Sequence, residues 1–259
     1  MTWLGYPDTT GLAAIDWRLT DAMTDPAPAA ELRHSEKLAR IDGCFLCYEP
    51  PADAPAVRLR ESGAPIVFGS FNHLAKINRT TLALWSRVLD AVSGSQLVLK
   101  SAPLKFPDTV DRVIEALEQC GIDPARVELR GWAGVREQHL DAYGDIDIAL
   151  DTFPYNGTTT TCEALWMGVP VVTLAGAVHM SRVGASLLAA AGLDDLIAHD
   201  ADGFVKTAVE IARDYARRRE LRGGLRQQLA RSRLLDHQGF TRGLEAQYRH
   251  AWRGCCAQG

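Results

Sequence analysis

Hydrophobic and polar residues follow two alternating patterns along the middle of the chain. Short apolar runs rich in β-branched residues, such as IVFGSF and PVVTL, predict buried strands at 66–71, 96–100, 127–132, 146–151 and 170–174. Apolar residues spaced three and four apart predict helices at 78–92, 108–121, 136–144, 158–168 and 179–192. Strands that alternate with helices are typical of βαβ units. We therefore predict an α/β fold with a parallel sheet flanked by helices.

Both ends of the chain depart from this alternation. Residues 1–60 are rich in Pro, Ala and Asp and have weak periodicity, so we predict loops there, one short helix in AAELRHSEKLARI, and a linker at 49–58. After about residue 200 the pattern is helical throughout, which predicts a helical C-terminal extension. The chain is thus expected to have two parts, residues 1–60 and residues 61–259.

Composition narrows the class of protein. Hydrophobic residues make up 47% of the chain and charged residues 23%, with a net charge of −4, so no basic surface for nucleic acid or lipid is indicated. No apolar run approaches the roughly 18 residues that span a membrane, and MTWLGYPDTTG lacks the features of a signal peptide. We expect a cytoplasmic protein with no nucleic-acid or membrane partner.

Two patterns resemble metal sites, and both favour another interpretation. Cys44 and Cys47 form a lone C-x-x-C with no second pair at a suitable spacing, so reduced cysteines are favoured over a zinc or redox site. Asp145 and Asp147 resemble an Asp-x-Asp metal pair, but they open a predicted strand and lie away from its carboxyl end. We predict structural roles for them and no metal ion.

The predicted sheet points to one place for a ligand. In open parallel sheets, ligands bind beyond the carboxyl ends of the strands. Four loops in that position concentrate polar residues, at 69–76, 131–139, 151–161 and 174–182. We expect the functional site to be built from these loops.

The loop GTTTT gives the strongest chemical signal. Gly157 frees the backbone to turn, and Thr158, Thr159 and Thr160 then present hydroxyls and unpaired N–H groups at a helix N-terminus. Such an end binds anions, and phosphate is the usual one. The alternative is a plain helix cap, but one threonine suffices for a cap. Four threonines therefore favour a phosphate site.

Each of three further residues has a functional and a structural interpretation. Lys76 is either a positive charge directed at the same phosphate or a solvated surface lysine. His139 either stacks on a base or takes part in proton transfer, unless it is merely structural. Glu163 either accepts hydrogen bonds from ribose or complements the helix dipole. G-x-G-x-x-G and P-loop motifs are absent, which favours a nucleotide diphosphate bound without a P-loop.

Several long motifs resemble one enzyme family. FGSFNHLAKIN, LDTFPYNGTTTTCEALWMGVPVVTLAG and SRVGASLLAAAGL resemble the C-terminal catalytic lobe of the O-GlcNAc transferase and SPINDLY family. WLGYPDTTGLAAIDWRLTD and LEAQYRHAW are similar to the same family, so the resemblance covers nearly the whole chain. It implies the C-terminal, Rossmann-like lobe of a two-lobed GT-B glycosyltransferase.

The resemblance also implies a reaction. These enzymes transfer a sugar from a nucleotide diphosphate to Ser or Thr hydroxyls of proteins, with inversion and without a metal. The implied partners are a nucleotide sugar and a protein acceptor, with UDP-GlcNAc as the expected donor and no cofactor. GTTTT follows the SPINDLY-like pattern, because the GlcNAc branch often has histidine where Thr158 stands. GDP-fucose, which SPINDLY-type plant enzymes use, is therefore the alternative donor.

Site residues follow from the resemblance, residue by residue. Lys76 matches the lysine on the diphosphate and is the catalytic candidate, and His73 lies in the same motif. The nucleotide-sugar site is further expected to include Arg136 and His139 at the base, Glu163 at the ribose, and Thr158, Thr159 and Thr160 at the phosphates. Leu4, Gly5 and Pro7 match a loop near the sugar and acceptor.

The resemblance leaves part of the family's machinery outside residues 1–259. Family members carry an N-terminal lobe and a tetratricopeptide array upstream of WLGYP, and the histidine proposed as catalytic base has no counterpart in this sequence. Residues 1–60 are thus expected to be a remnant of that lobe. Two hypotheses stay open: a transferase that is active with the upstream lobe, and a non-catalytic nucleotide-binding module. A NAD-dependent oxidoreductase is disfavoured by the missing glycine fingerprint.

Overall fold

A six-stranded parallel sheet forms the centre of the molecule. The computed structural model describes residues 1–61, 63–131 and 134–257, apart from the side chain of Arg136. The sheet has the order β5-β4-β3-β6-β7-β8, and all its neighbouring strands are parallel. Its strands are β3 (Val67–Ser70), β4 (Gln96–Lys100), β5 (Val127–Arg130), β6 (Ile148–Leu150), β7 (Val171–Leu174) and β8 (Ile197–Ala198).

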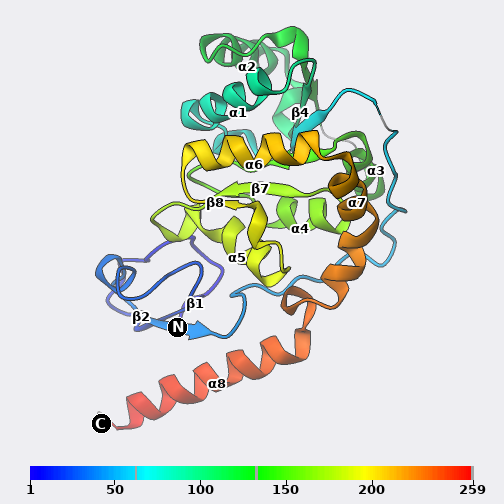
Figure 1. Ribbon diagram of the computed structural model, residues 1–259. Coiled ribbons are helices and arrows are strands. Elements are labelled where there is room, and N and C mark those ends of the chain that lie inside the picture. Colours follow the sequence, from blue (N-terminus) through cyan, green and yellow to red (C-terminus); the bar gives the residue numbers. More distant parts are fainter. Residues whose placement is uncertain (62, 132–133, 258–259) are drawn as a thin grey trace.

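Helices cover both faces of this sheet, as Figure 1 shows. α1 packs against α6 on one face, and α4 and α5 lie together on the other, where α4 also contacts α7. The helices are α1 (Arg79–Ala91), α2 (Pro107–Gln119), α3 (Arg136–Asp141), α4 (Thr159–Trp166), α5 (Val183–Ala190), α6 (Ala201–Arg213), α7 (Tyr215–Ala230) and α8 (His237–Cys256). Among the described residues, no helix combines the length and the apolar character that crossing a bilayer requires.

The strand order fixes where a ligand fits. Counted in chain order from β3, the strands run 3-2-1-4-5-6, which is the doubly wound order of Rossmann-type folds. The order reverses between β3 and β6, so the loops that follow these two strands diverge to opposite faces. The place between these loops is where ligands bind in such sheets, and it is called the crevice below. The loop after β3 carries Lys76, and the loop after β6 carries the threonines.

The central strands are apolar because both their faces are covered. Every residue of β3, β6 and β7 is buried, as expected for inner strands of a parallel sheet. Close packing explains the glycine at position 69 in β3, because a Cβ there would lie 2.7 Å from the side chain of Ile146. Helix ends are also encoded locally, since Asn78 caps α1 through the N–H of Thr81, and Gly121 and Gly168 end helices with positive φ.

The predicted α/β architecture is confirmed, with two local corrections. The helix expected in AAELRHSEKLARI is wrong: only Glu31–Arg33 is helical, as a 3-10 turn, and Lys37–Ile41 forms strand β2. β2 pairs in parallel with β1 (Trp17–Asp21), so residues 1–60 hold more regular structure than predicted. Strand β8 was also not expected, because its two residues are too short to give a pattern.

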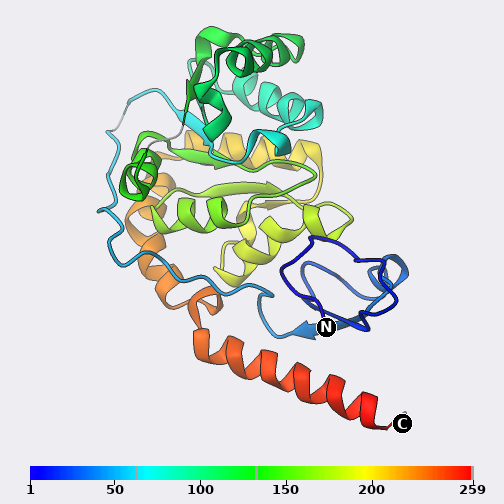
Figure 2. The same ribbon diagram turned by 180° about the vertical axis from the view of Figure 1, so that it is seen from behind.

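The N-terminal segment and the C-terminal helix form a second, smaller core. Leu19, Ala39 and Ile41 from the β1–β2 pair are buried against Phe240 and Leu244 of α8. Figure 2 shows α8 running along the N-terminal segment, far from the edge of the sheet that carries α1 and α2. Segments from opposite ends of the sequence are therefore packed together.

Buried polar contacts join this segment to the main sheet. Nδ1 of His179 lies 2.7 Å from Oδ2 of Asp25, and the hydroxyl of Ser186 donates to Oδ2 of Asp21 at 2.5 Å. Arg182 donates to the carbonyl oxygen of Met23 at 2.7 Å. His179 and Arg182 belong to the loop after β7, so the contacts lie on the carboxyl-end side of the sheet.

Candidate functional site

Lys76 lies against the loop that carries the threonines. Its Nζ donates to the carbonyl oxygen of Asn156 at 2.7 Å and stands 4.0 Å from the ring centroid of Tyr155. Burial lowers the pKa of the Lys76 ammonium, and the nearby carboxylate of Asp151 opposes that effect. The side chain is half-buried at the crevice, so the interpretation as a solvated surface lysine is wrong.

The threonines lie at the N-terminus of helix α4, and the side chain at the N-cap position does not cap the helix. Thr158 occupies the N-cap position, but its side chain makes no capping hydrogen bond. Thr160 donates its hydroxyl to Oδ1 of Asn72 at 2.7 Å, which ties α4 to the loop after β3. The first backbone N–H groups of a helix have no partner inside it. The structure thus has an open helix N-terminus beside Lys76, the geometry that binds anions.

Asp151 holds the loop between β6 and α4 in place through buried hydrogen bonds. It follows β6 directly, and its Oδ1 accepts hydrogen bonds from the N–H groups of Thr152 at 2.8 Å and Gly157 at 2.7 Å. Its Oδ2 accepts from the hydroxyl of Thr173 at 2.7 Å. Burial raises the pKa of Asp151 to about 6, although these three donors favour the ionised form. A Cβ on Gly157 would lie 2.9 Å from Oδ1 of Asn72, so the turn requires glycine.

His139 and Glu163 meet at the other end of the crevice. Nε2 of His139 lies 3.0 Å from Oε2 of Glu163, and both side chains are about 10% exposed. The single hydroxyl proton of Tyr143 is shared between the same Oε2 at 3.4 Å and the carbonyl oxygen of Thr160 at 3.2 Å. Glu163 is therefore neither solvated nor confined to a dipole interaction, because it pairs with His139.

Lys100 completes this group, and sequence patterns did not single it out. It ends β4, is 4% exposed, and places Nζ 3.0 Å from Nδ1 of His139. Burial, with Arg130 nearby, lowers the pKa of Lys100 to about 8. The feature of the sequence that could have indicated Lys100 is its position at the carboxyl end of the apolar strand QLVLK. The contact with His139 depends on how β4 and α3 are placed, which periodicity does not reveal.

The other predicted residues have different surroundings. His73 is exposed, and its Nδ1 accepts a hydrogen bond from the N–H of Ala75 at 3.2 Å. Arg136 opens α3, and its side chain lies outside the described part of the chain. Among the described residues, no hydrogen bond or ion pair joins Leu4, Gly5 or Pro7 to the loops around Lys76. Roles for these five residues stay predictions.

The side chains that resembled metal ligands have structural partners. Asp145 pairs with Arg130 at 2.6 Å and with Arg58 at 2.8 Å, and Asp147 pairs with Arg60 at 2.9 Å. Cys44 is buried, and burial raises the pKa of its thiol to about 12, as expected for an unreactive cysteine. Its sulfur lies 3.2 Å from the hydroxyl of Ser186.

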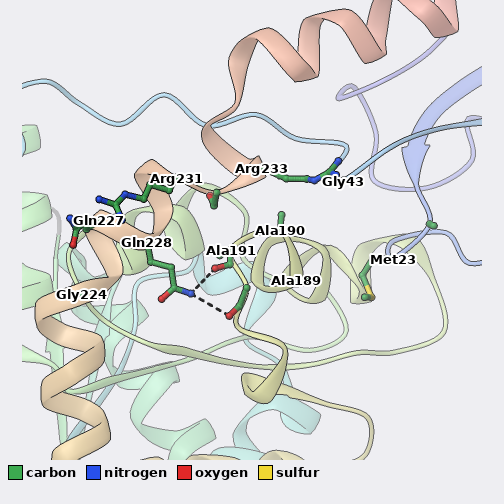
Figure 3. Close-up of a pocket in the computed structure, with 13 residues that line it drawn as sticks. Met23, Gly43, Ala189, Ala190, Ala191, Gly224, Gln227, Gln228, Arg231 and Arg233 are labelled. Carbon is green, nitrogen blue, oxygen red and sulfur yellow. Dashed lines mark hydrogen bonds between the residues drawn. The ribbon is translucent and has the colours of Figure 1, made fainter.

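A large open groove lies elsewhere on the molecule. It has a volume of about 890 Å³ and runs between the ends of α5 and α7, as Figure 3 shows. Nε2 of Gln228 donates there to the carbonyl oxygens of Ala191 at 2.8 Å and Gly192 at 3.2 Å, which satisfies the end of α5. None of the predicted site residues that the structure describes lines this groove, so its size does not make it the candidate site.

Known proteins resemble this chain over nearly its whole length. The profile of glycosyl transferase family 41 matches residues 57–244, which include both loops of the crevice. The chain belongs to glycosyl transferase family 41. Two curated relatives, from Solanum lycopersicum and Arabidopsis thaliana, are 46% and 44% identical over 99% of this chain. Both are named "Probable UDP-N-acetylglucosamine--peptide N-acetylglucosaminyltransferase SPINDLY".

The chain matches only part of the length of each of these relatives. It spans 28% of the length of each of the two. Among solved structures, a mutant of the Thermobaculum terrenum O-GlcNAc transferase is 40% identical and superposes with a TM-score of 0.91 over 99% of this chain and 49% of the other. A sucrose-phosphate synthase from Thermosynechococcus elongatus, 16% identical with a TM-score of 0.56, covers 92% of this chain and 59% of its own, and shares the fold.

Proposed function

We propose that this chain is the donor-binding lobe of a protein O-glycosyltransferase. The reaction is transfer of N-acetylglucosamine from UDP-GlcNAc to Ser or Thr hydroxyls of proteins, with inversion and without a metal. The observation that carries the proposal is the position of the Lys76 ammonium beside the open N-terminus of α4, at the switch point of the sheet. The names of the family 41 relatives support a peptide acceptor and a UDP-GlcNAc donor.

The two cationic elements suit the leaving group. Negative charge grows on the nucleoside diphosphate as the glycosidic bond breaks. Lys76 uses one of its three N–H donors on Asn156, which leaves two for phosphate oxygens. The N–H groups at the start of α4, including that of Thr160, contribute further donors together with the hydroxyls of Thr158 and Thr159. The hydroxyl of Thr160 already donates to Asn72. One preorganised donor in such a position typically lowers a barrier by about 2.7–4 kcal/mol.

The rest of the donor is assigned to neighbouring residues. His139 and Arg136 are assigned to the base, and His73 is assigned to the nucleotide-sugar site. Oε2 of Glu163 is engaged by His139 and Tyr143, so its Oε1 is the oxygen assigned to a ribose hydroxyl. Leu4, Gly5 and Pro7 are assigned to the sugar and acceptor, together with an upstream lobe.

GDP-fucose is the alternative donor, and one observation favours it. Thr158 stands where the resemblance leads us to expect histidine in the GlcNAc branch, and its hydroxyl makes no capping bond. Six relatives at 43–46% identity are named SPINDLY, whereas the SEC protein of Arabidopsis thaliana is 28% identical over 99% of this chain and 27% of its own length. A non-catalytic nucleotide-binding module is the second alternative.

Calorimetric titration tests the proposal directly. The purified chain is titrated with UDP, GDP and NAD, each in the presence of EDTA. Saturable binding of UDP in preference to GDP is expected. Preference for GDP would move the donor to GDP-fucose, and binding of NAD alone would contradict a glycosyltransferase. Transfer to a Ser/Thr peptide is then measured for the protein with its flanking genomic sequence, and nucleotide binding without any transfer would favour the non-catalytic module.

A further inference from the structure

A buried lysine lies behind the base end of the site. Lys100 is 4% exposed, and its Nζ lies 3.0 Å from Nδ1 of His139, 3.3 Å from the carbonyl oxygen of His139 and 5.3 Å from the ring centroid of Phe71. Burying an ammonium is costly unless its protons find acceptors. Among the described residues, the two acceptors within hydrogen-bond distance of Lys100 Nζ both belong to His139, so we infer that the lysine holds that residue.

The chemistry of an ammonium fixes the state of the imidazole. A lysine ammonium has three donors and no acceptor, so Nδ1 of His139 must accept from it and cannot carry a proton. The proton of the neutral ring then lies on Nε2, which donates to Oε2 of Glu163 at 3.0 Å. Both ring nitrogens of His139 therefore have partners inside the protein.

The contacts continue from His139 to the phosphate end. Oε2 of Glu163 also accepts from the hydroxyl of Tyr143 at 3.4 Å, and this hydroxyl lies 3.2 Å from the carbonyl oxygen of Thr160. Lys100, His139, Glu163 and Tyr143 therefore connect strand β4 to the first turn of α4. A change at Lys100 reaches the base end first and the phosphate end through Tyr143.

We propose that Lys100 is a positioning residue for the nucleotide: it fixes His139 as a neutral imidazole protonated on Nε2 and sets the plane in which that ring meets the base. The role in nucleotide binding rests on the proposed function, whereas the assigned protonation state does not. Lys100 touches neither the sugar nor the phosphates in this assignment, so it acts through His139.

The first experiment measures which ring nitrogen of His139 carries the proton. Long-range ¹H–¹⁵N spectra of the full chain at pH 7 resolve the two tautomers of a neutral histidine, and a His139→Gln variant identifies the signal. The Nε2–H tautomer is expected in the wild type without nucleotide. The Nδ1–H tautomer in the wild type would overturn the proposal, whether or not any variant folds.

Variants then test the role of the donor. Lys100→Met keeps the length of the side chain and removes the donor, whereas Lys100→Gln keeps a neutral donor. Lys105→Met, at an exposed lysine five residues along the chain, is the matched control. Lys100→Met is expected to mix the two tautomers of His139 and to weaken binding of the preferred nucleotide about tenfold. Lys100→Gln should recover part of both effects.

Two outcomes separate this inference from the proposed function. If Lys100→Met leaves both the tautomer and the nucleotide affinity unchanged, Lys100 is a structural lysine and the inference is overturned. If the wild type binds neither UDP nor GDP, the proposed function fails, and the tautomer measurement still decides the state of His139.

Discussion

At the scale of single residues, the crevice contains a cation whose charge is only partly balanced. Burial lowers the pKa of Lys76, and its nearest oxygen is a carbonyl rather than a carboxylate. The ionised carboxylate of Asp151 is already occupied by three donors from its own loop and from β7. A diphosphate would supply the full negative charge that Lys76 lacks, so binding should stabilise the charged form of this lysine.

Substitution of Lys76 should therefore act on the phosphates. We expect Lys76→Ala to weaken binding of the nucleoside diphosphate by about 10- to 100-fold, since hydrogen bonds to charged groups are worth about 1.5–3 kcal/mol. Binding of the matching nucleoside should change little. Titration calorimetry with both ligands measures the difference, with Lys105→Ala as the control. Equal losses for the two ligands would remove Lys76 from the phosphate site.

The threonine hydroxyls have a test of similar design. Thr159 is exposed in the first turn of α4, and Val keeps its shape without the hydroxyl. Thr159→Val should reduce affinity for the diphosphate roughly fivefold, corresponding to about 1 kcal/mol for one hydrogen bond. Thr80→Val changes an exposed threonine in the first turn of α1 and is the matched control. Unchanged affinity in Thr159→Val would leave this threonine without a part in phosphate binding.

At the scale of elements, the site depends on how one buried carboxylate holds a loop between β6 and α4. Asp151 gathers the N–H groups of Thr152 and Gly157 and the hydroxyl of Thr173, so it joins β6, β7 and the turn before α4. Its raised pKa has a consequence for stability. Between its ordinary value of 3.8 and about 6, the folded state binds more protons at this group than the unfolded state does.

Stability should accordingly depend on pH through Asp151. As the pH rises through this window, the free energy of unfolding of the wild type should fall relative to that of Asp151→Asn, by on the order of 2–3 kcal/mol. Urea denaturation of both proteins at several pH values from 4 to 7 measures the difference, with Asp53→Asn in the exposed linker as control. A difference that rises with pH would show that Asp151 is stabilised as a carboxylate.

Elements with strong periodicity could be predicted from the sequence, and contacts between elements could not. QLVLK gave strand β4 with the right bounds, because an apolar run between turns is a local signal. KLARI was wrongly predicted as helix. It forms a strand because it pairs with β1, and a local pattern does not reveal a contact across some twenty residues. Lys76 and the threonines were found from their loops. Lys100 and Tyr143 were missed because they act from elements that meet His139 and Glu163 only in the folded chain.

At the scale of the whole molecule, the N-terminal segment is held to the sheet by buried polar contacts. Asp25 is 1% exposed and contacts His179 at 2.7 Å and the hydroxyl of Thr20 at 2.5 Å. Desolvation opposes the charge of Asp25, but its hydrogen bonds with His179 and Thr20 and the charge of His34 lower its pKa below the ordinary value. The carboxylate thus fixes the position of the segment relative to the loop after β7.

Removing that carboxylate should cost much of the stability. We expect Asp25→Ala to lower the free energy of unfolding by about 3–5 kcal/mol, because it removes two buried hydrogen bonds to a carboxylate, each worth about 1.5–3 kcal/mol. Asp42→Ala breaks an ion pair with Arg233 in which the carboxylate is 88% exposed, and it should change stability by less than about 1 kcal/mol. Urea denaturation measures both variants. Similar small effects would mean that the segment contributes little to the fold.

The packing of α8 against the N-terminal segment also decides how the chain responds to being cut. Residues 42–66 connect the segment to β3 and contain neither helix nor strand where the structure describes them, which makes them the natural target of a protease. A cut there leaves the segment bound to α8 through Leu19, Ala39 and Ile41, and bound to the β7 loop through Asp25. Mild proteolysis should yield two peptides on a denaturing gel that migrate as one particle in gel filtration, so the fold does not depend on the continuity of its backbone.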